Sequence, residues 1–228
     1  MAFDWMKIPY SLLTLFIVVN YGFLLGAFIQ KIGARAGRRH GIPIWQNYLD
    51  IIKNYGQRSS ITHGVMFYLG PVFRLSGGVG LLLFVPTIYG SYMFSNLSFA
   101  GDLILALYFV FFGTLGMALG AAESGHPHAA IGITRGLSQM TAAELPFALA
   151  VFSVALQYQT LSVTDIVGAQ QGGFLNWTLF TNPIAVTAAM LGFLGSMMRP
   201  AFDVVLAPQE IPIGPPTEYH SSYFALIQ

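Results

Sequence analysis

The chain is organised around residues 198–226, which read MRPAFDVVLAPQEIPIGPPTEYHSSYFAL. This stretch follows one apolar run, leads into another, and sets isolated carboxylates among apolar residues and prolines. A loop that is only solvated needs neither Phe202 beside Asp203 nor several prolines to restrict its backbone. The pattern therefore predicts a charged connector that folds back against the helix ends of a membrane domain.

The composition identifies an integral membrane protein. Hydrophobic residues make up 55% of the 228 residues and charged residues only 8%, whereas soluble domains average about 25% charged residues. The sequence has no cysteine, which excludes cysteine-bound zinc or iron-sulfur centres, so we expect electron transfer to take place on partners. The net charge of +1 argues against nucleic-acid binding. We also expect no cleavable signal, because Asp4 and Lys7 precede an apolar run of full span length.

The apolar runs predict an all-α transmembrane bundle, a single membrane domain over residues 1–228 with about five spans and the start of a sixth. Runs of about 20 apolar residues form helices in a bilayer, because a helix satisfies its own backbone polar groups. The expected spans are 9–29, 64–93, 101–122, 142–158, 181–198 and 222–228 onward. The expected loops on one side of the membrane are 30–63, 123–141 and 199–221.

Lysines and arginines concentrate in alternate connectors. They occur in all three of those loops, whereas connectors 94–100 and 159–180 contain none. Cytoplasmic loops of membrane proteins carry an excess of lysine and arginine. We therefore expect the three basic loops to face the cytoplasm and the N-terminus to lie outside.

The first basic loop contains an amphipathic pattern. Apolar residues recur there at helical spacing with polar residues beside them, as in a helix at the membrane interface. The apolar residues are Trp45, Leu49 and Ile52, and the polar residues are Gln46, Asp50 and Lys53. Such a helix either anchors the chain on anionic lipid or provides a docking surface for a soluble partner, and the pattern leaves both interpretations open.

Three blocks of residues occur in an order that is typical of one family. The first block is Lys31, Arg35, Arg39, Gly41, Gln46, Asp50 and Lys53; the second is Gly132, Arg135, Gln139 and Glu144; the third is Arg199, Phe202, Asp203, Glu210, Gly214, Glu218, Tyr219 and residues 224–226. Together they resemble the subunit 1 family of respiratory complex I. That family includes the matching membrane subunit of energy-converting nickel-iron hydrogenases and related archaeal complexes.

Some positions depart from the quinone-reducing members of this family. Leu206 and Pro208 stand where those members usually carry carboxylates, and Gly37 stands where a glutamine is common. The resemblance therefore implies the hydrogenase-like branch, in which quinone is possible but not favoured as the electron acceptor. The family also normally continues through about three helices at its C-terminal end, whereas this sequence stops inside the expected sixth span.

The resemblance implies a subunit without a cofactor of its own, which docks a soluble redox module and couples its chemistry to proton or sodium translocation. The expected partners are hydrogenase-like large and small subunits, an iron-sulfur subunit and antiporter-like membrane subunits. Iron-sulfur clusters and a nickel-iron centre would belong to those partners, in the plasma membrane of a prokaryote. Two alternatives remain: a quinone-binding subunit of an NADH:quinone oxidoreductase-type complex, and a passive membrane anchor.

The candidate residues form two sets, neither of which is catalytic or binds a metal. The ion-pathway set is Arg74, Glu123, Glu144, Asp203, Glu210 and Glu218. The docking set is Lys31, Arg35, Arg39, Gln46, Asp50, Lys53, Arg135, Gln139, Arg199, Phe202 and Tyr219.

Charges near the membrane have structural alternatives. A lone arginine at membrane depth costs about 2.5 to 3.5 kcal/mol unless it is paired or hydrated, so Arg74 should face protein or water, or reach the surface if its span begins later. Glu123 at a helix C-terminus opposes the helix dipole and needs a partner such as Arg135 or Arg199. Asp102 at a helix start is better explained as a cap than as a proton carrier.

Glu144 has two interpretations. Its spacing from Thr141 is that of a capping box at a helix start, although Pro146 would disturb the second turn of such a helix. As a buried carboxyl group it would have a raised pKa and could load and release a proton, which the resemblance favours. His126 and His128 lack a third ligand, so they are poor evidence for a metal site.

Overall fold

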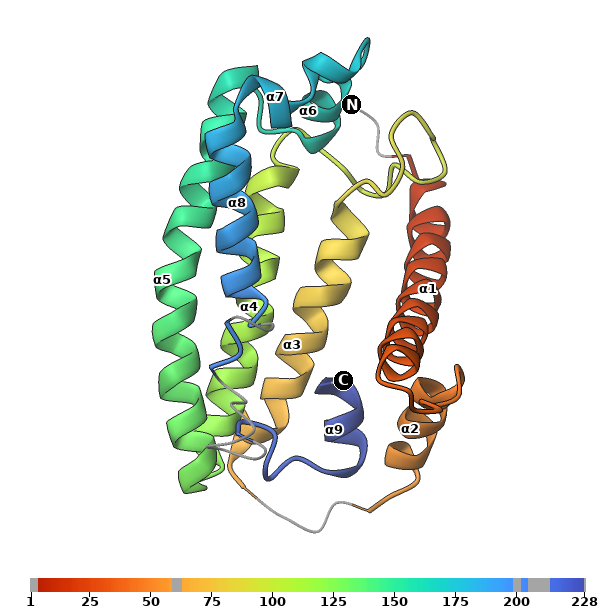
Figure 1. Cartoon of the computed structure of the whole chain (residues 1–228), viewed down its shortest axis with the longest axis vertical. Coiled ribbons are helices and arrows are strands. Elements are labelled where there is room, and N and C mark those ends of the chain that lie inside the picture. The colour runs from red at the N-terminus through yellow and green to blue at the C-terminus, as the bar shows by residue number, and fades with distance from the viewer. Residues whose placement is uncertain (1–3, 59–62, 199–201, 205–213, 228) are drawn as a thin grey trace.

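The computed structural model of the chain describes residues 4–58, 63–198, 202–204 and 214–227. Within these residues the chain is helical apart from turns and connectors, and it contains no strand (Figure 1). This confirms the all-α class. The elements in chain order are α1 (Lys7–Ala36), α2 (Gln46–Tyr55), α3 (Val65–Phe84), α4 (Asp102–Glu123), α5 (Pro127–Tyr158), α6 (Val163–Ala169), η1 (Phe174–Asn176), α7 (Thr178–Thr181), α8 (Pro183–Ser196) and α9 (Ser221–Ile227).

Four helices in the described part of the chain, α1, α3, α4 and α5, are long and apolar enough to cross a membrane. Helix α8 corresponds to the predicted span 181–198 but has only 14 residues. At 1.5 Å per residue it extends about 21 Å, which is less than the hydrocarbon core of about 30 Å. Helix α9 begins at Ser221, close to the predicted start of the sixth span.

The predicted loop 123–141 is wrong, because most of it belongs to α5. The helix begins at Pro127, since the fixed φ of proline suits the first helical position. The preceding residue caps this start: the His128 N–H donates to His126 Nδ1 at 3.2 Å. Helix α5 therefore has 32 residues and extends well beyond the predicted span 142–158.

The predicted span 64–93 ends earlier in the structure, at Phe84. Pro86 is the reason, because a proline disfavours the helical backbone at the residue before it, and Val85 is extended, with a ψ of 127°. The connector that follows folds back onto this helix end, where Asn96 Nδ2 donates to the Val85 carbonyl at 2.6 Å. The polar amide thereby satisfies a carbonyl that the helix end leaves free.

Helix α1 lies at the edge of the bundle and extends past the predicted span 9–29 (Figure 1). Helix α2 folds back beside its middle. Asn47 Nδ2 donates to the Phe23 carbonyl at 2.8 Å, and the Tyr48 hydroxyl donates to Asn20 Oδ1 at 2.9 Å. Helix α9 contacts both α2 and α3, so the C-terminal part of the described chain lies between the first two helical hairpins.

Helices α3 and α4 run antiparallel along a seam of glycines. A Cβ atom on Gly70 would lie 2.8 Å from the Gly120 Cα, and one on Gly77 would lie 2.8 Å from the Gly113 Cα. Membrane helices approach this closely only where small residues line the interface, because lipid supplies no hydrophobic force to push them together. The seam therefore sets the distance between the two helices and brings the end of α4 beside the start of α3.

Two adjacent glycines test this seam. We expect Gly77→Ala to lower the free energy of unfolding by about 1 to 3 kcal/mol, because the backbones must separate to admit the methyl group. Gly78 has open space at its Cβ position, so Gly78→Ala should be neutral or slightly stabilising. Thermal unfolding of both variants in detergent, followed by circular dichroism, measures the difference, and equal effects would contradict the packing role.

Candidate functional site

The candidate site is built around the backbone of Phe67, in the first turn of α3. A helical carbonyl accepts a hydrogen bond from the N–H four residues later, and for Phe67 that residue is Pro71, which has no N–H. The Tyr219 hydroxyl donates to the Phe67 carbonyl instead, at 2.9 Å. Tyr219 thus supplies the hydrogen bond that the proline removes.

The Tyr219 side chain is packed tightly at this position. It is buried and stacks on Phe67, with ring centroids 4.3 Å apart and an interplanar angle of 7°. Its hydroxyl occupies space that two glycines leave open: a Cβ atom on Gly120 would overlap it, and one on Gly70 would lie 3.1 Å away. Ile133 of α5 belongs to the same buried cluster. Helices α3, α4 and α5 therefore meet at the tyrosine.

Glu123 binds the N–H of the same residue. The Phe67 N–H donates to Glu123 Oε2 at 2.6 Å. Glu123 ends α4, and because α4 is antiparallel to α3, its carboxylate lies at the N-terminus of α3. The N–H groups of a first helical turn have no partner within the helix, and the helix dipole favours a negative charge there. The unfavourable position predicted for Glu123 is thus compensated by a neighbouring helix start.

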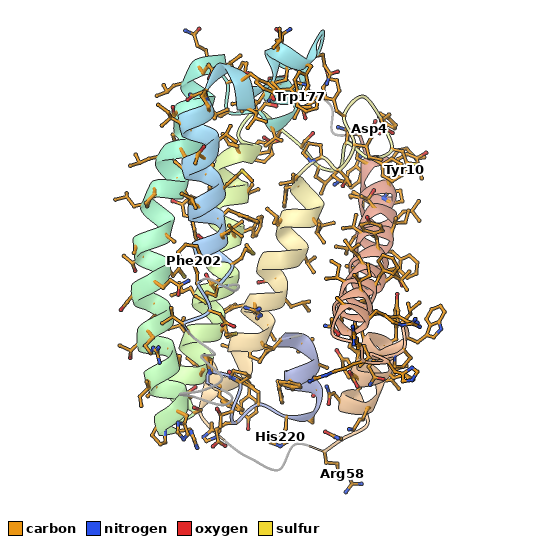
Figure 2. All side chains as sticks on the ribbon, in the orientation of Figure 1. Asp4, Tyr10, Arg58, Trp177, Phe202 and His220 are labelled. Atoms are coloured by element: carbon orange, nitrogen blue, oxygen red, sulfur yellow. The ribbon has the colours of Figure 1, made fainter. Side chains whose placement is uncertain are left out.

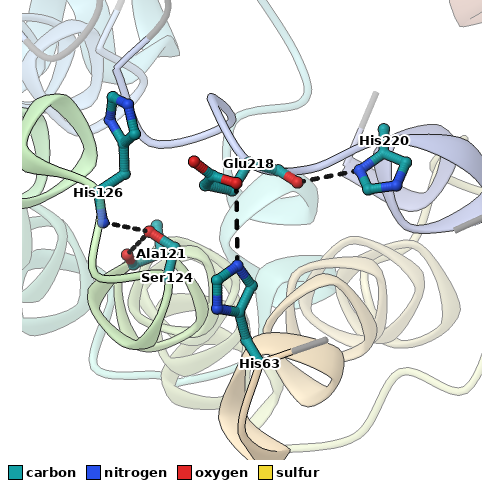
Figure 3. Close-up of polar contacts among 6 residues, drawn as sticks. All are labelled: His63, Ala121, Ser124, His126, Glu218 and His220. Atoms are coloured by element: carbon teal, nitrogen blue, oxygen red, sulfur yellow. Dashed lines mark hydrogen bonds and ion pairs between the residues drawn. The ribbon is translucent and has the colours of Figure 1, made fainter. Parts of the chain in front are cut away.

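Glu218 and Tyr219 belong to a short segment that returns to the bundle before α9, and we call residues 214–220 the return segment. Glu218 Oε2 lies 3.8 Å from His63 Nε2, and the Glu218 carbonyl lies 3.1 Å from His220 Nδ1 (Figure 3). The His63 ring in turn lies 4.6 Å from the Phe67 ring, centroid to centroid. The return segment therefore contacts the start of α3 through two successive residues.

Burial and the negative charge of Glu123 raise the pKa of Tyr219 well above its usual value near 10. The phenol is therefore protonated at neutral pH. It acts as a hydrogen-bond donor to the Phe67 carbonyl and not as a proton carrier.

Arg74 lies seven residues beyond Phe67 on α3, about 10 Å further along the helix axis. Its side chain is half-buried, and Nε donates to the Ile227 carbonyl of α9 at 3.1 Å. It also lines a cavity of about 30 Å³ with Thr114, Met140 and Pro215, among others. A cavity of this size has room for water. The structure thus directs Arg74 into the protein, from the middle of α3.

Glu144 lies in the middle of α5, so its interpretation as a helix cap is wrong, because the helix begins at Pro127. The side chain is half-buried, one turn from Met140, whose sulfur accepts from Thr114 Oγ1 at 2.9 Å. Gln139 donates through Nε2 to the Gly195 carbonyl of α8 at 2.8 Å. Within the described residues, no hydrogen bond or ion pair joins Glu144 to Phe67, Glu123 or Tyr219.

Of the predicted residues after α8, Phe202 and Asp203 are half-buried. Asp203 Oδ1 is buried and has no hydrogen-bond partner among the described residues. Arg199 and Glu210 lie outside the described residues. The predicted pairing of Arg199 with its neighbours therefore stays a prediction.

The predicted docking residues of the first loop lie at one end of the bundle, which we call the basic end. Arg58 and His220 lie at this end, opposite Asp4, Tyr10 and Trp177 (Figure 2). Helix α2 forms as predicted and exposes an apolar row, Trp45, Leu49 and Ile52. On its polar side Gln46 Nε2 donates to Asp50 Oδ1 at 2.7 Å. The remaining basic docking residues are Lys31, Arg35, Arg39 and Lys53, with Arg135 on the first turns of α5.

Sequence reasoning missed Phe67, Pro71 and His63. One signal was available, because a proline inside an apolar span always leaves the carbonyl four residues earlier without its helical donor. Nothing in the sequence showed which donor would replace it. Tyr219 was predicted only as a docking residue, whereas the structure buries it between the membrane helices.

The capping role of Glu123 is testable with two substitutions. Glu123→Ala removes both the acceptor and the charge, so we expect a loss of about 1 to 2 kcal/mol in unfolding free energy. Glu123→Gln keeps an acceptor and loses only the interaction with the dipole, which is worth about 0.3 to 1 kcal/mol at an exposed site. Thermal denaturation in detergent measures both, and equal stability of all three proteins would contradict the cap.

The raised pKa of Tyr219 predicts a pH dependence. Below pH 10 the tyrosine is protonated in both the folded and the unfolded chain, so the stability advantage of wild type over Tyr219→Phe should be constant between pH 6 and about pH 9. Above pH 10 the unfolded tyrosine ionises while the folded one does not, so the advantage should decline. Unfolding experiments along a pH series measure the stability difference between wild type and Tyr219→Phe. A difference that grew as the pH rose above 10 would contradict the burial of the Tyr219 hydroxyl.

Comparison with known proteins shows the family of the chain. The family model described as NADH dehydrogenase matches residues 8–228. Among solved structures, the chain is similar to a subunit of an archaeal respiratory membrane complex, the membrane-bound sulfane sulfur reductase. The identity is 31% and the TM-score 0.85, over 97% of this chain and 72% of that chain. The chain therefore belongs to the NADH dehydrogenase family, the complex I subunit 1 family, whose members are membrane subunits of respiratory complexes.

Proposed function

We propose that the chain docks a soluble, hydrogenase-like redox module at the basic end and couples the redox chemistry of that module to proton or sodium translocation. One observation carries the proposal. The return segment contacts the start of α3 through Glu218 and Tyr219, and it also lines the cavity beside Arg74 through Pro215. A segment outside the membrane-spanning helices thereby reaches the cavity beside an arginine in the middle of α3.

The titratable groups along this route differ in exposure. Glu218 and His63 are half-buried and Glu123 is exposed, so all three are accessible to solvent. Arg74 lies deeper, and Glu144 is one turn from Met140 at the wall of the same cavity. Movement of the return segment would displace the Glu218 carboxylate from His63 and alter the wall of the cavity beside Arg74.

The charge of the basic end supports docking there. The basic residues of α1 and α2, together with Arg135, present positive charge, which steers an acidic partner surface toward this end. By the positive-inside rule, we expect the same end to face the cytoplasm. The iron-sulfur clusters and the nickel-iron centre would lie in the docked subunits, because this chain has no cysteine to bind them. Antiporter-like subunits would pack against the apolar faces of the spans within the plasma membrane of a prokaryote.

Two alternatives make different predictions. The matching family model is described as NADH dehydrogenase. This description favours a quinone-binding subunit as the second candidate. A passive anchor would need the same helices and the same basic end but no ion pathway. The composition of the native complex and the effect of single carboxyl groups separate these three functions.

The composition is measured by mass spectrometry of the complex solubilised in mild detergent. We expect co-purifying hydrogenase-like large and small subunits, an iron-sulfur subunit and antiporter-like membrane chains, without stoichiometric quinone. Stoichiometric quinone would favour the quinone-binding alternative. Purification of the chain alone under conditions that preserve membrane complexes would contradict docking.

The ion pathway is tested by neutralising its carboxyl groups. Glu144→Gln and Glu218→Gln should each reduce ion translocation per electron at least about tenfold while electron transfer continues, because the proton-binding groups are lost and the redox centres are not. Asp165→Asn, an exposed carboxyl group on α6 at the other end of the bundle, serves as the control and should leave the ratio unchanged. Vesicles containing the whole complex allow both rates to be measured, and a passive anchor would show the wild-type ratio in every variant.

A further inference from the structure

We propose that Tyr219 is a positioning residue. Its hydroxyl donates to the Phe67 carbonyl the hydrogen bond that Pro71 cannot donate, and this hydrogen bond holds the return segment in register on α3. The residues involved are Tyr219, Pro71 and Phe67, whose carbonyl accepts the hydrogen bond. Its consequence for coupling rests on the proposed function, whereas the positional claim can be tested by itself.

The first argument concerns the Phe67 carbonyl. Phe67 is only 1% exposed, and Tyr219 covers it. A buried carbonyl without a donor costs about 1 to 3 kcal/mol, and Pro71 guarantees that the helix itself supplies none. Burial of the Phe67 carbonyl under residue 219 is therefore favourable only if the side chain of residue 219 carries a hydrogen-bond donor. A phenylalanine would stack equally well and still leave the carbonyl unsatisfied.

The second argument concerns space. Gly70 and Gly120 leave an opening at the seam between α3 and α4, and the tyrosine hydroxyl occupies it. Because a Cβ atom on Gly120 would overlap the hydroxyl, the ring reaches this position only where the glycines stand. A shift of the return segment by one residue would place Glu218 or His220 at the opening instead. The glycine seam and the tyrosine therefore define a single register.

The third argument concerns what the register positions. With Tyr219 in place, Glu218 lies against His63 on one side, and Pro215 lines the Arg74 cavity on the other. Glu123 accepts from the Phe67 N–H, and Tyr219 donates to the Phe67 carbonyl. Loss of one hydroxyl would therefore loosen three contacts that the proposed ion pathway uses, without altering any titratable group in that pathway.

The experiment is a double-mutant cycle read by cysteine labelling. The chain has no cysteine, so a single Thr217→Cys substitution, at a half-buried site in the return segment, reports local opening through its rate of reaction with a maleimide. The rate is measured in the purified whole complex by mass spectrometry of this subunit. We expect Tyr219→Phe to increase the rate about tenfold, since one net hydrogen bond to a buried group is lost.

The informative comparison is the same substitution in a Pro71→Ala background. The alanine restores an N–H that donates to the Phe67 carbonyl, so adding Tyr219→Phe should then increase the labelling rate less than about twofold. An equal increase in both backgrounds would overturn the proposal. If the Tyr219→Phe complex fails to assemble, recovery of assembly by Pro71→Ala supports the proposal, and failure of the double variant contradicts it.

The control is Tyr223→Phe. Tyr223 lies four residues further along, its ring contacts Tyr68 at 5.1 Å between centroids, and it makes no hydrogen bond within the described residues. This substitution should leave the labelling rate unchanged, and an increase equal to that of Tyr219→Phe would contradict a specific role of the Tyr219 hydroxyl. Ion translocation per electron is measured on the same samples. Faster labelling with normal translocation would retain the positioning role of Tyr219 and contradict the coupling function.

Discussion

The structure depends on how the two polar backbone groups of Phe67 are hydrogen-bonded at the start of α3. A helix that contains a proline has a carbonyl without its helical donor, and burial of Phe67 under Tyr219 keeps water from replacing that donor. Tyr219 supplies the donor, and Glu123 accepts the N–H of the same residue. Three segments that are distant in sequence are thereby joined at one residue, and the bundle gains a polar junction at its basic end.

Close packing of α3 on α4 makes this junction possible. Glycines at both ends of the seam let the two backbones approach, so the end of α4 comes within hydrogen-bond distance of the first turn of α3. The same glycines leave the space in which the Tyr219 hydroxyl lies. Larger residues would separate the helices, remove the carboxylate from the helix start and close the opening. Packing and hydrogen bonding therefore depend on each other here.

The junction also connects chemistry at the surface with the interior of the membrane domain. Glu218 lies against His63 at the basic end, and Pro215 lies at the cavity beside Arg74. Coupling between distant sites requires a contiguous element with two discrete arrangements. The return segment is contiguous, and the limited opening at the seam favours one register over intermediate positions. These features are the physical basis of the coupling proposed for the segment.

The sequence alone determined the membrane class, the all-α fold and the family, because apolar length, charge composition and the order of short motifs are properties of local sequence. It misplaced the start of α5, where Pro127 was a helix-start signal in a stretch that was interpreted as a loop. Tertiary structure alone decided the partners of Glu123 and of the Phe67 carbonyl. Tyr219 lies 152 residues from Phe67 along the chain. A proline predicts that a carbonyl needs a donor, but which side chain reaches it depends on how distant segments pack.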